Sequence, residues 1–116
     1  MRPEARALLW DIERAAAAID QFVAGLDSSA YANSDLIHSA VERKFEIIGE
    51  ALNRLAKAHP GIAGRIPRLR EIIAFRNVLV HGYAAIEHDR VWRIALGALP
   101  TLRETVARLL AEQTKF

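Results

Sequence analysis

The sequence predicts an all-α fold, an antiparallel bundle of four to five helices in a single domain over residues 1–116. Apolar residues recur at intervals of three and four in four separate segments, which is the spacing of one buried stripe on a helix. Short polar or Pro- and Gly-containing connections separate these segments, with almost no strand pattern and no internal repeat. A chain of 116 residues is long enough to bury a core without disulfides, and this one has no cysteine.

The first two expected helices are the longest. The first covers residues 4–26, with an apolar stripe that includes Leu8, Ile12 and Ile19, and the polar run at residues 27–29 ends it. The second has its N-cap among residues 33–35 and its stop at Pro60 and Gly61. It contains Gly49, and the first helix contains the run of alanines at 15–18; such small residues let a neighbouring helix approach closely, inside the subunit or across a dimer interface.

The third and fourth expected helices differ in how proline enters them. The third begins at Pro67, whose missing N–H suits a first helical turn, and ends at Gly82 as its C-cap. The fourth covers residues 89–109 and contains Gly97 and Pro100. Because proline inside a helix removes a hydrogen bond and clashes with the preceding turn, we expect one bent helix or two short ones.

The overall charge excludes little, because a net charge of +2 is too small to indicate a nucleic-acid-binding protein. Its distribution is more informative. Arg65, Arg68, Arg70 and Arg76 fall within twelve positions and form a local basic patch. The first three are weak candidates for binding RNA or phosphate, and an ordinary solvated helix face is the alternative.

The location of the protein is predicted from what its composition lacks. The absence of cysteine is compatible with a reducing compartment. No window approaches the roughly 20 apolar residues of a membrane span, and the N-terminus carries acidic residues in place of a signal peptide. We therefore expect a cytoplasmic protein without a membrane partner.

The stretch FRNVLVHGY, residues 75–83, places ionisable groups within an apolar run. Arg76 lies on or beside the apolar stripe, so its charge requires a carboxylate, a phosphate or an edge open to water. Arg76 and His81 are five residues apart, about 140° around a helix, and cannot reach one point from a single regular helix. Asn77 and His81, four apart, share a face. A purely structural explanation also exists, in which His81 caps the helix, Arg76 snorkels and Tyr83 fills the end of the bundle.

Acidic residues recur along the second expected helix, at Glu42, Glu46 and Glu50. A solvated face of ion pairs is the favoured interpretation, because basic residues surround them. In the alternative, Glu46 or Glu50 points inward and pairs with Arg76.

Other ligand patterns are missing from the sequence. The histidines outside the 75–83 stretch show no metal-ligand spacing with one another, and they are His38, His59 and His88. No phosphate-binding glycine loop is present. We expect no structural metal and no cofactor.

The 75–83 stretch resembles a known motif, which consists of arginine, a polar residue, a spacer, histidine, any residue and tyrosine. The matching residues are Arg76, Asn77, His81 and Tyr83. The motif is that of the HEPN superfamily, and specifically of the HepT-like ribonuclease toxins. Further segments resemble the same family, and together they cover nearly the whole chain: AVERKFEIIGEALNRL at 40–55, RIP at 65–67, VW at 91–92 and LPTL at 99–102. Arg68 departs from the family pattern, since many relatives have tryptophan there.

The resemblance implies a HEPN-type bundle and a homodimer that cleaves RNA without a metal ion at a site shared by two copies of the motif. Such cleavage needs a base for the ribose 2′-OH, an acid for the departing 5′-oxygen and a cation for the charge on phosphorus. By resemblance, His81 is the general acid or base, Arg76 contacts the phosphate and the transition state, and Asn77 orients His81 or the phosphate.

The resemblance also implies a partner. HepT-like toxins are paired with an MntA-like nucleotidyltransferase antitoxin that transfers AMP to the motif tyrosine, here Tyr83, in a type VII toxin–antitoxin system. The alternatives are a non-catalytic HEPN module that binds a nucleotidyltransferase or a nucleotide, and a purely structural dimerisation bundle.

Overall fold

The computed structural model describes residues 1–81 and 86–112. Over these residues the chain forms seven α-helices and no strand, which confirms the all-α prediction. The helices are α1 (Pro3–Val23), α2 (Ser28–Ala32), α3 (Asp35–Ala58), α4 (Pro60–Ala63), α5 (Leu69–His81), α6 (His88–Leu96) and α7 (Ala98–Glu112). None of these helices combines the length and the apolar run that a membrane crossing needs.

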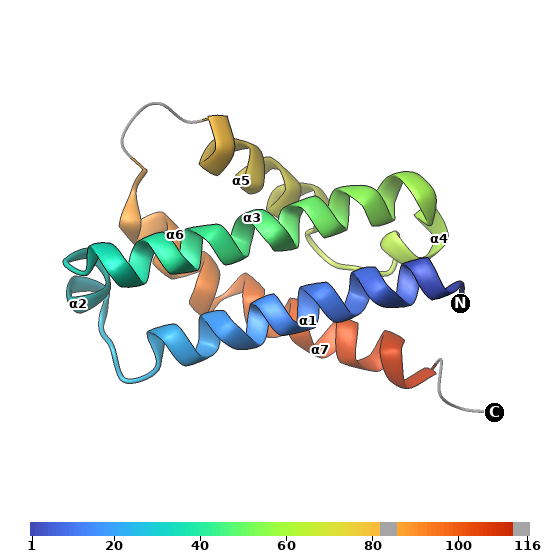
Figure 1. Cartoon of the computed structure of the whole chain (residues 1–116), viewed down its shortest axis with the longest axis horizontal. Helices are drawn as coiled ribbons and strands as arrows, with labels where there is room; N and C mark the ends of the chain where they lie inside the picture. Colours follow the sequence, from blue (N-terminus) through green and yellow to red (C-terminus); the bar gives the residue numbers. More distant parts are fainter. Residues whose placement is uncertain (82–85, 113–116) are drawn as a thin grey trace.

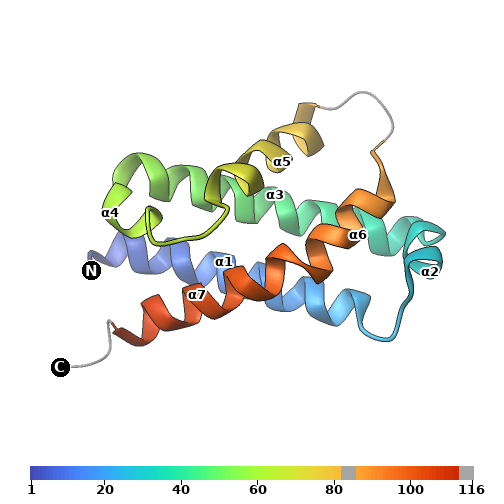
Figure 2. The same cartoon turned by 180° about the vertical axis from the view of Figure 1, so that it is seen from behind.

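The long helices α1 and α3 lie antiparallel at the centre of the bundle, as Figures 1 and 2 show. α1 packs mainly against α3 and α7, whereas α5 packs mainly against α3 and so lies at the outside. The apolar stripes predicted for the long helices are buried, with Leu9, Ile12 and Ile19 in α1 and Ile48 and Leu52 in α3. Burying each such side chain contributes about 1.5–3 kcal/mol, so this central pair accounts for much of the stability of the bundle.

Two short helices, α2 and α4, occupy segments that were predicted only to end the long helices. The polar run that ends α1 begins α2, because the Asp27 carboxylate accepts a hydrogen bond from the Ala30 N–H at 2.8 Å. Ser34 is the N-cap of α3, one of the three residues proposed, and its hydroxyl accepts from the Ile37 N–H at 3.2 Å. Pro60 is the first residue of α4, where its missing N–H needs no partner.

The start of α5 corrects the sequence prediction. Arg68 has a φ of 60°, in the left-handed region, so a right-handed helix cannot run through it from Pro67. The helix begins at Leu69 instead. The predicted C-cap, Gly82, lies outside the described residues.

The break in the last predicted helix is confirmed. α6 ends at Leu96, and its cap residue Gly97 donates its N–H to the Arg93 carbonyl at 2.8 Å. Pro100 lies in the first turn of α7, where backbone N–H groups have no partner within the helix, so the proline costs no hydrogen bond there. The fourth predicted element is therefore two helices.

Candidate active site

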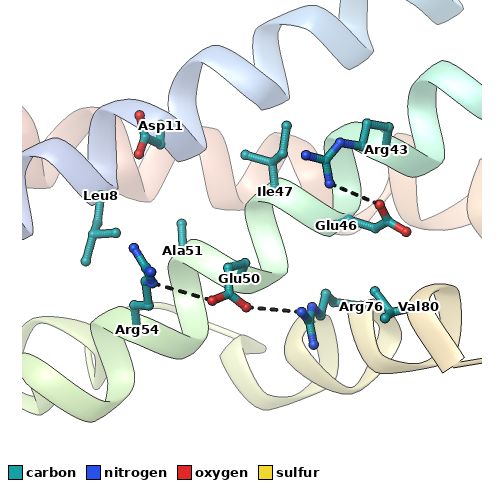
Figure 3. Close-up of a pocket in the computed structure, with 10 residues that line it drawn as sticks. All are labelled: Leu8, Asp11, Arg43, Glu46, Ile47, Glu50, Ala51, Arg54, Arg76 and Val80. Atoms are coloured by element: carbon teal, nitrogen blue, oxygen red, sulfur yellow. Dashed lines mark hydrogen bonds and ion pairs between the residues drawn. The ribbon is translucent and has the colours of Figure 1, made fainter.

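A groove opens between α1, α3 and α5, with a volume of about 400 Å³ (Figure 3). We call it the Arg76 groove. Its apolar lining comes from Leu8, Ile47, Ala51 and Val80. Its charged lining comes from Asp11, Arg43, Glu46, Glu50, Arg54 and Arg76. Both kinds of side chain come from α1, α3 and α5, and α1 and α5 each pack against α3, so this packing sets the positions of the charged groups.

Arg76 is held by Glu50 across the α3–α5 contact. Arg76 Nη2 lies 3.1 Å from Glu50 Oε2, and Glu50 Oε1 lies 3.4 Å from Arg54 Nε. The side chain of Arg76 is 24 % exposed, so it is neither buried nor fully solvated. The favoured interpretation, a face of ion pairs, agrees with the contacts of Glu50 with Arg54 and of Glu46 with Arg43. The alternative pairing with Arg76 is also present and involves Glu50, whose side chain remains partly exposed. Glu46 pairs with Arg43 at 3.3 Å.

The Glu50 carboxylate pairs with both Arg54 and Arg76, so these three side chains carry one net positive charge, whereas the six charged lining residues of the whole groove sum to zero. One carboxylate neutralises one of the two guanidinium groups of Arg54 and Arg76. Arg76 Nε is buried and has no hydrogen-bond partner among the described residues. Its Nη1 and Nη2 atoms contact Asn77 and Glu50. A guanidinium at the edge of an open groove is suited to bind a carboxylate or a phosphate.

Gly49 explains how Arg76 comes so near to α3. A Cβ added to Gly49 would lie 2.1 Å from Arg76 Cβ and 2.5 Å from Arg76 Cγ, far inside van der Waals contact. Only glycine permits this approach. The sequence expectation that Gly49 lets a helix pack closely is confirmed inside the subunit, and the helix is α5.

The other motif residues on α5 are arranged differently. Arg76 Nη1 donates to Asn77 Oδ1 at 3.1 Å, so these two neighbours are joined. Asn77 lines a second hollow that also contains Lys57 and Arg70. His81 is the last residue of α5 and is exposed. Among the described residues no hydrogen bond or ion pair connects His81 to Arg76, and Tyr83 lies outside the described residues.

The four clustered arginines line four separate hollows of the described structure, although they are close in sequence. Arg65 Nη2 pairs with Glu112 at 2.6 Å. Arg68 donates two hydrogen bonds to Glu71, at 2.8 and 2.9 Å, and this contact holds the pKa of the Glu71 carboxyl below its usual range. Arg70 is the member of the set that lies in the hollow lined by Asn77.

Sequence spacing did not connect two histidines that the fold brings together. The rings of His38 on α3 and His88 on α6 stack with their centroids 4.0 Å apart. No local pattern could reveal this contact, because the two residues are 50 positions apart and meet only when α6 folds back onto α3.

A comparison of the sequence with protein families identifies the family of this chain. The family model described as "Ribonuclease HepT-like" matches residues 12–109. The chain belongs to this family. The match covers α2 to α6 completely and most of α1 and α7, so it includes all of α5 and every groove residue except Leu8 and Asp11.

Curated proteins from an archaeon and a bacterium are similar over most of their lengths. "Putative RNase MJ1380" of Methanocaldococcus jannaschii is 29 % identical over 89 % of this chain and 94 % of its own. "Putative RNase MJ0125" of the same organism is 27 % identical over 92 % and 91 %. "Putative RNase TTE0752" of Caldanaerobacter subterraneus subsp. tengcongensis is 28 % identical over 78 % and 80 %. No solved structure gives a significant match.

Proposed function

We propose that this protein is an endoribonuclease toxin that cleaves RNA without a metal ion. The observation that carries the proposal is the Arg76 guanidinium, held by Glu50 at the edge of an open groove and located on the same helix as an exposed His81. Membership of the HepT-like family and the ribonuclease names of the relatives support it. Arg76 would bind the scissile phosphate and stabilise the charge that develops on it.

His81 supplies the proton transfers in this mechanism. The ribose 2′-oxygen loses its proton and attacks phosphorus, the bond to the 5′-oxygen breaks, and the 5′-oxygen takes up a proton. The products are a 2′,3′-cyclic phosphate and a 5′-hydroxyl. Imidazole suits either proton transfer, because its ordinary pKa is about 6.5. Asn77, hydrogen-bonded to Arg76, would keep the guanidinium oriented.

The distance between Arg76 and His81 along α5 favours a site built from two protomers. A regular helix separates the two side chains by about 140°. A two-fold axis that brings the α5 helices together would place His81 of one protomer beside Arg76 of the other. We therefore propose a cytoplasmic homodimer whose composite cleft binds RNA.

Control of the activity is assigned to Tyr83, two positions after His81 in the sequence. An MntA-like nucleotidyltransferase antitoxin would transfer AMP to its hydroxyl, as in type VII toxin–antitoxin systems. The added phosphodiester is anionic and would compete with the RNA phosphate for Arg76. Mass spectrometry of the protein co-expressed with such a partner tests this, and an unmodified Tyr83 would contradict it.

Cleavage of RNA in the presence of EDTA tests the mechanism. We expect the wild-type protein to keep its rate in EDTA at a temperature well below unfolding, with 2′,3′-cyclic phosphate ends. His81→Ala should lower the rate by about 10²–10⁴-fold, the usual contribution of general acid–base catalysis, and Arg76→Gln should do likewise. His59→Gln is the matched control. A nuclease that needs a metal, or that is indifferent to His81, would refute the mechanism.

The second candidate is a non-catalytic HEPN module that binds a nucleotidyltransferase or a nucleotide. It is favoured by the ion pair between Arg76 and Glu50, which already satisfies much of the arginine. Expression of the chain alone in cells separates the two functions. Growth arrest that His81→Ala relieves supports the toxin, whereas harmless expression combined with partner binding supports the module.

A further inference from the structure

Three potential metal ligands converge where α2, α3 and α6 meet, at one end of the bundle (Figure 1). His38 and Glu42 lie one turn apart on α3, and His88 is the first residue of α6. Glu42 Oε2 lies 3.4 Å from His38 Nδ1 and 3.9 Å from His88 Nδ1. We call these three residues the His–Glu cluster. None of them lines the Arg76 groove.

The cluster is covered, and the Nδ1 atom of each of its histidines has no hydrogen-bond partner in the described part of the chain. The side chains of His38 and Glu42 are 13 % and 18 % exposed, and that of His88 is 32 % exposed. Both Nδ1 atoms are buried and have no hydrogen-bond partner among the described residues. Because proteins rarely leave buried polar atoms unpaired, two of them facing one carboxylate indicate a missing partner.

Aromatic side chains close the cluster on one side. Tyr31 is completely buried, and its ring lies 6.3 Å from each of the two imidazoles. Trp92 lies 5.4 Å from the Tyr31 ring. The Tyr31 hydroxyl is also buried without a hydrogen-bond partner in the described part of the chain. Such an apolar wall limits water, which strengthens the interaction of charged groups with whatever fills the cluster.

Asp35 fixes how His38 presents its ring. His38 Nε2 lies 3.1 Å from Asp35 Oδ1, so Nε2 carries the proton that it donates to this carboxylate. In the neutral ring Nδ1 then has a free lone pair, which faces the Glu42 carboxylate at 3.4 Å. Two electron-rich atoms at this distance repel each other unless a proton or a metal ion lies between them. A carboxylate behind a histidine is also the arrangement that orients imidazole ligands of metals.

We propose that the His–Glu cluster binds one Zn²⁺ ion through His38 Nδ1, Glu42 Oε2 and His88 Nδ1. Ligands at about 2.0–2.1 Å from a tetrahedral zinc ion lie roughly 3.3 Å from one another. The two separations from Glu42, 3.4 and 3.9 Å, are close to this value, and all three ligand atoms lie within 4.8 Å of one another, so binding requires the two stacked rings to turn toward a common point. Two imidazoles and one carboxylate suit zinc, whereas Mg²⁺ and Ca²⁺ prefer oxygen ligands. A water molecule completes the coordination.

The role assigned to this ion is structural. It ties the first residue of α6 to the first half of α3, two segments that are joined otherwise by ring contacts. The proposal replaces the expectation of no structural metal, which rested on sequence spacing alone. It is independent of the proposed ribonuclease mechanism, because the RNA phosphate and the zinc ion would occupy different sites.

Calorimetric titration of the EDTA-treated full-length protein with ZnCl₂ at pH 7.5 is the first test. We expect one ion per chain with a Kd below about 10 µM, and a rise of several degrees in the midpoint of thermal unfolding at saturating zinc. Co²⁺ in place of zinc should give the visible absorption of a tetrahedral complex. Absence of binding tighter than about 100 µM would overturn the proposal, whatever the outcome of the RNA-cleavage assay.

Matched variants locate the ion. His38→Gln and His88→Gln should each weaken zinc binding at least 100-fold, and Asp35→Asn should weaken it about 10- to 100-fold by releasing the His38 ring. The control is His59→Gln, because His59 Nε2 also faces a carboxylate, that of Glu4 at 3.8 Å, without a second imidazole. Wild-type affinity in both cluster variants would refute the assignment. The wild-type titration remains decisive if a variant fails to fold.

Discussion

The Arg76 groove and the His–Glu cluster both use carboxylates of α3, yet they leave opposite needs unsatisfied. In the groove, Glu50 pairs with both Arg54 and Arg76, so these three side chains carry one net positive charge beside an opening. In the cluster, about two turns earlier on the same helix, Glu42 faces two imidazole nitrogens that have no hydrogen-bond partner among the described residues. The first arrangement attracts an anion and the second a cation. Glu42 and Glu50 are the same residue type on one helix, but α6 places a histidine beside the first and α5 places an arginine beside the second. The neighbouring helix therefore decides what each carboxylate can do.

The largest expected effect tests whether the Arg76 groove depends on the close α3–α5 contact. Gly49→Ala places a methyl group 2.1 Å from Arg76 Cβ, so the two helices must move apart. Overpacking of this kind costs about 1–3 kcal/mol, measured by urea unfolding, and RNA cleavage should fall with it. Zinc binding by the distant His–Glu cluster should be unchanged.

The control for this substitution is Gly61→Ala. A Cβ at Gly61 would meet nothing within 4 Å, and alanine is the better helix former, so stability should stay within about 0.5 kcal/mol or rise slightly. Wild-type stability and cleavage in Gly49→Ala would show that α5 can shift freely and that the contact does not position Arg76.

The second prediction concerns the carboxylate that holds Arg76. Glu50→Gln removes the charge of the pair but keeps the shape of the side chain, so the guanidinium loses its constraint. We expect kcat for RNA cleavage to fall about tenfold, because misplaced catalytic groups are costly. KM should not rise, since one negative charge less favours RNA.

Glu46→Gln is the matched control, because Glu46 lines the same groove but pairs with Arg43. Its kinetic constants should remain those of the wild type. Equal losses of kcat in the two variants would mean that the groove responds to total charge and not to the orientation of Arg76.

The third prediction concerns Tyr31, the buried aromatic residue beside the His–Glu cluster. Tyr31→Phe removes a buried hydroxyl that has no hydrogen-bond partner among the described residues, so zinc-free protein should lose no stability and can gain up to about 1 kcal/mol. Urea unfolding in EDTA measures this. A loss of more than about 1 kcal/mol would reveal a hydrogen bond that holds the hydroxyl.

The smallest expected effect is that of the exposed ion pair between Arg68 and Glu71, with which the effects at the two sites can be compared. Arg68 holds the pKa of the Glu71 carboxyl below its usual value of about 4.5. The stabilisation is therefore present above pH 4.5 and is lost as the pH falls through the lower pKa of the folded state. Wild-type protein should have a slightly higher midpoint of thermal unfolding than Glu71→Gln at pH 7, and the two should converge near pH 2.5. A difference that persists at low pH would contradict the assignment.

Local spacing in the sequence was enough to predict the helices that carry most of the core. The apolar stripes of α1 and α3 are buried as expected, and Ser34 is the N-cap of α3. The last predicted helix is interrupted at Gly97, also as expected. Each of these features depends on residues within a few positions of one another, since a helix repeats every 3.6 residues. The same reasoning was wrong about Pro67, because the backbone of Arg68 turns into the left-handed region first.

The candidate site was predictable only in part. The position of Arg76 beside the apolar stripe required a carboxylate, a phosphate or an edge open to water, and Glu46 and Glu50 were named as possible partners. The choice of Glu50 required the packing of α5 over Gly49. The clustered arginines illustrate the limit, since adjacent positions on a short helix and its preceding turn point in different directions and line separate hollows.

The sequence by itself determined the all-α class, the family and the residues that could do chemistry on α5, because these follow from local periodicity and a contiguous motif. The tertiary structure decided which charges meet. His38 and His88 are 50 positions apart and stack only because α6 returns to the start of α3. Such contacts depend on the angles at which helices cross, and the spacing of nearby residues does not encode these angles. The sequence likewise indicated close packing at Gly49, but only the fold showed that α5 is the helix that packs there.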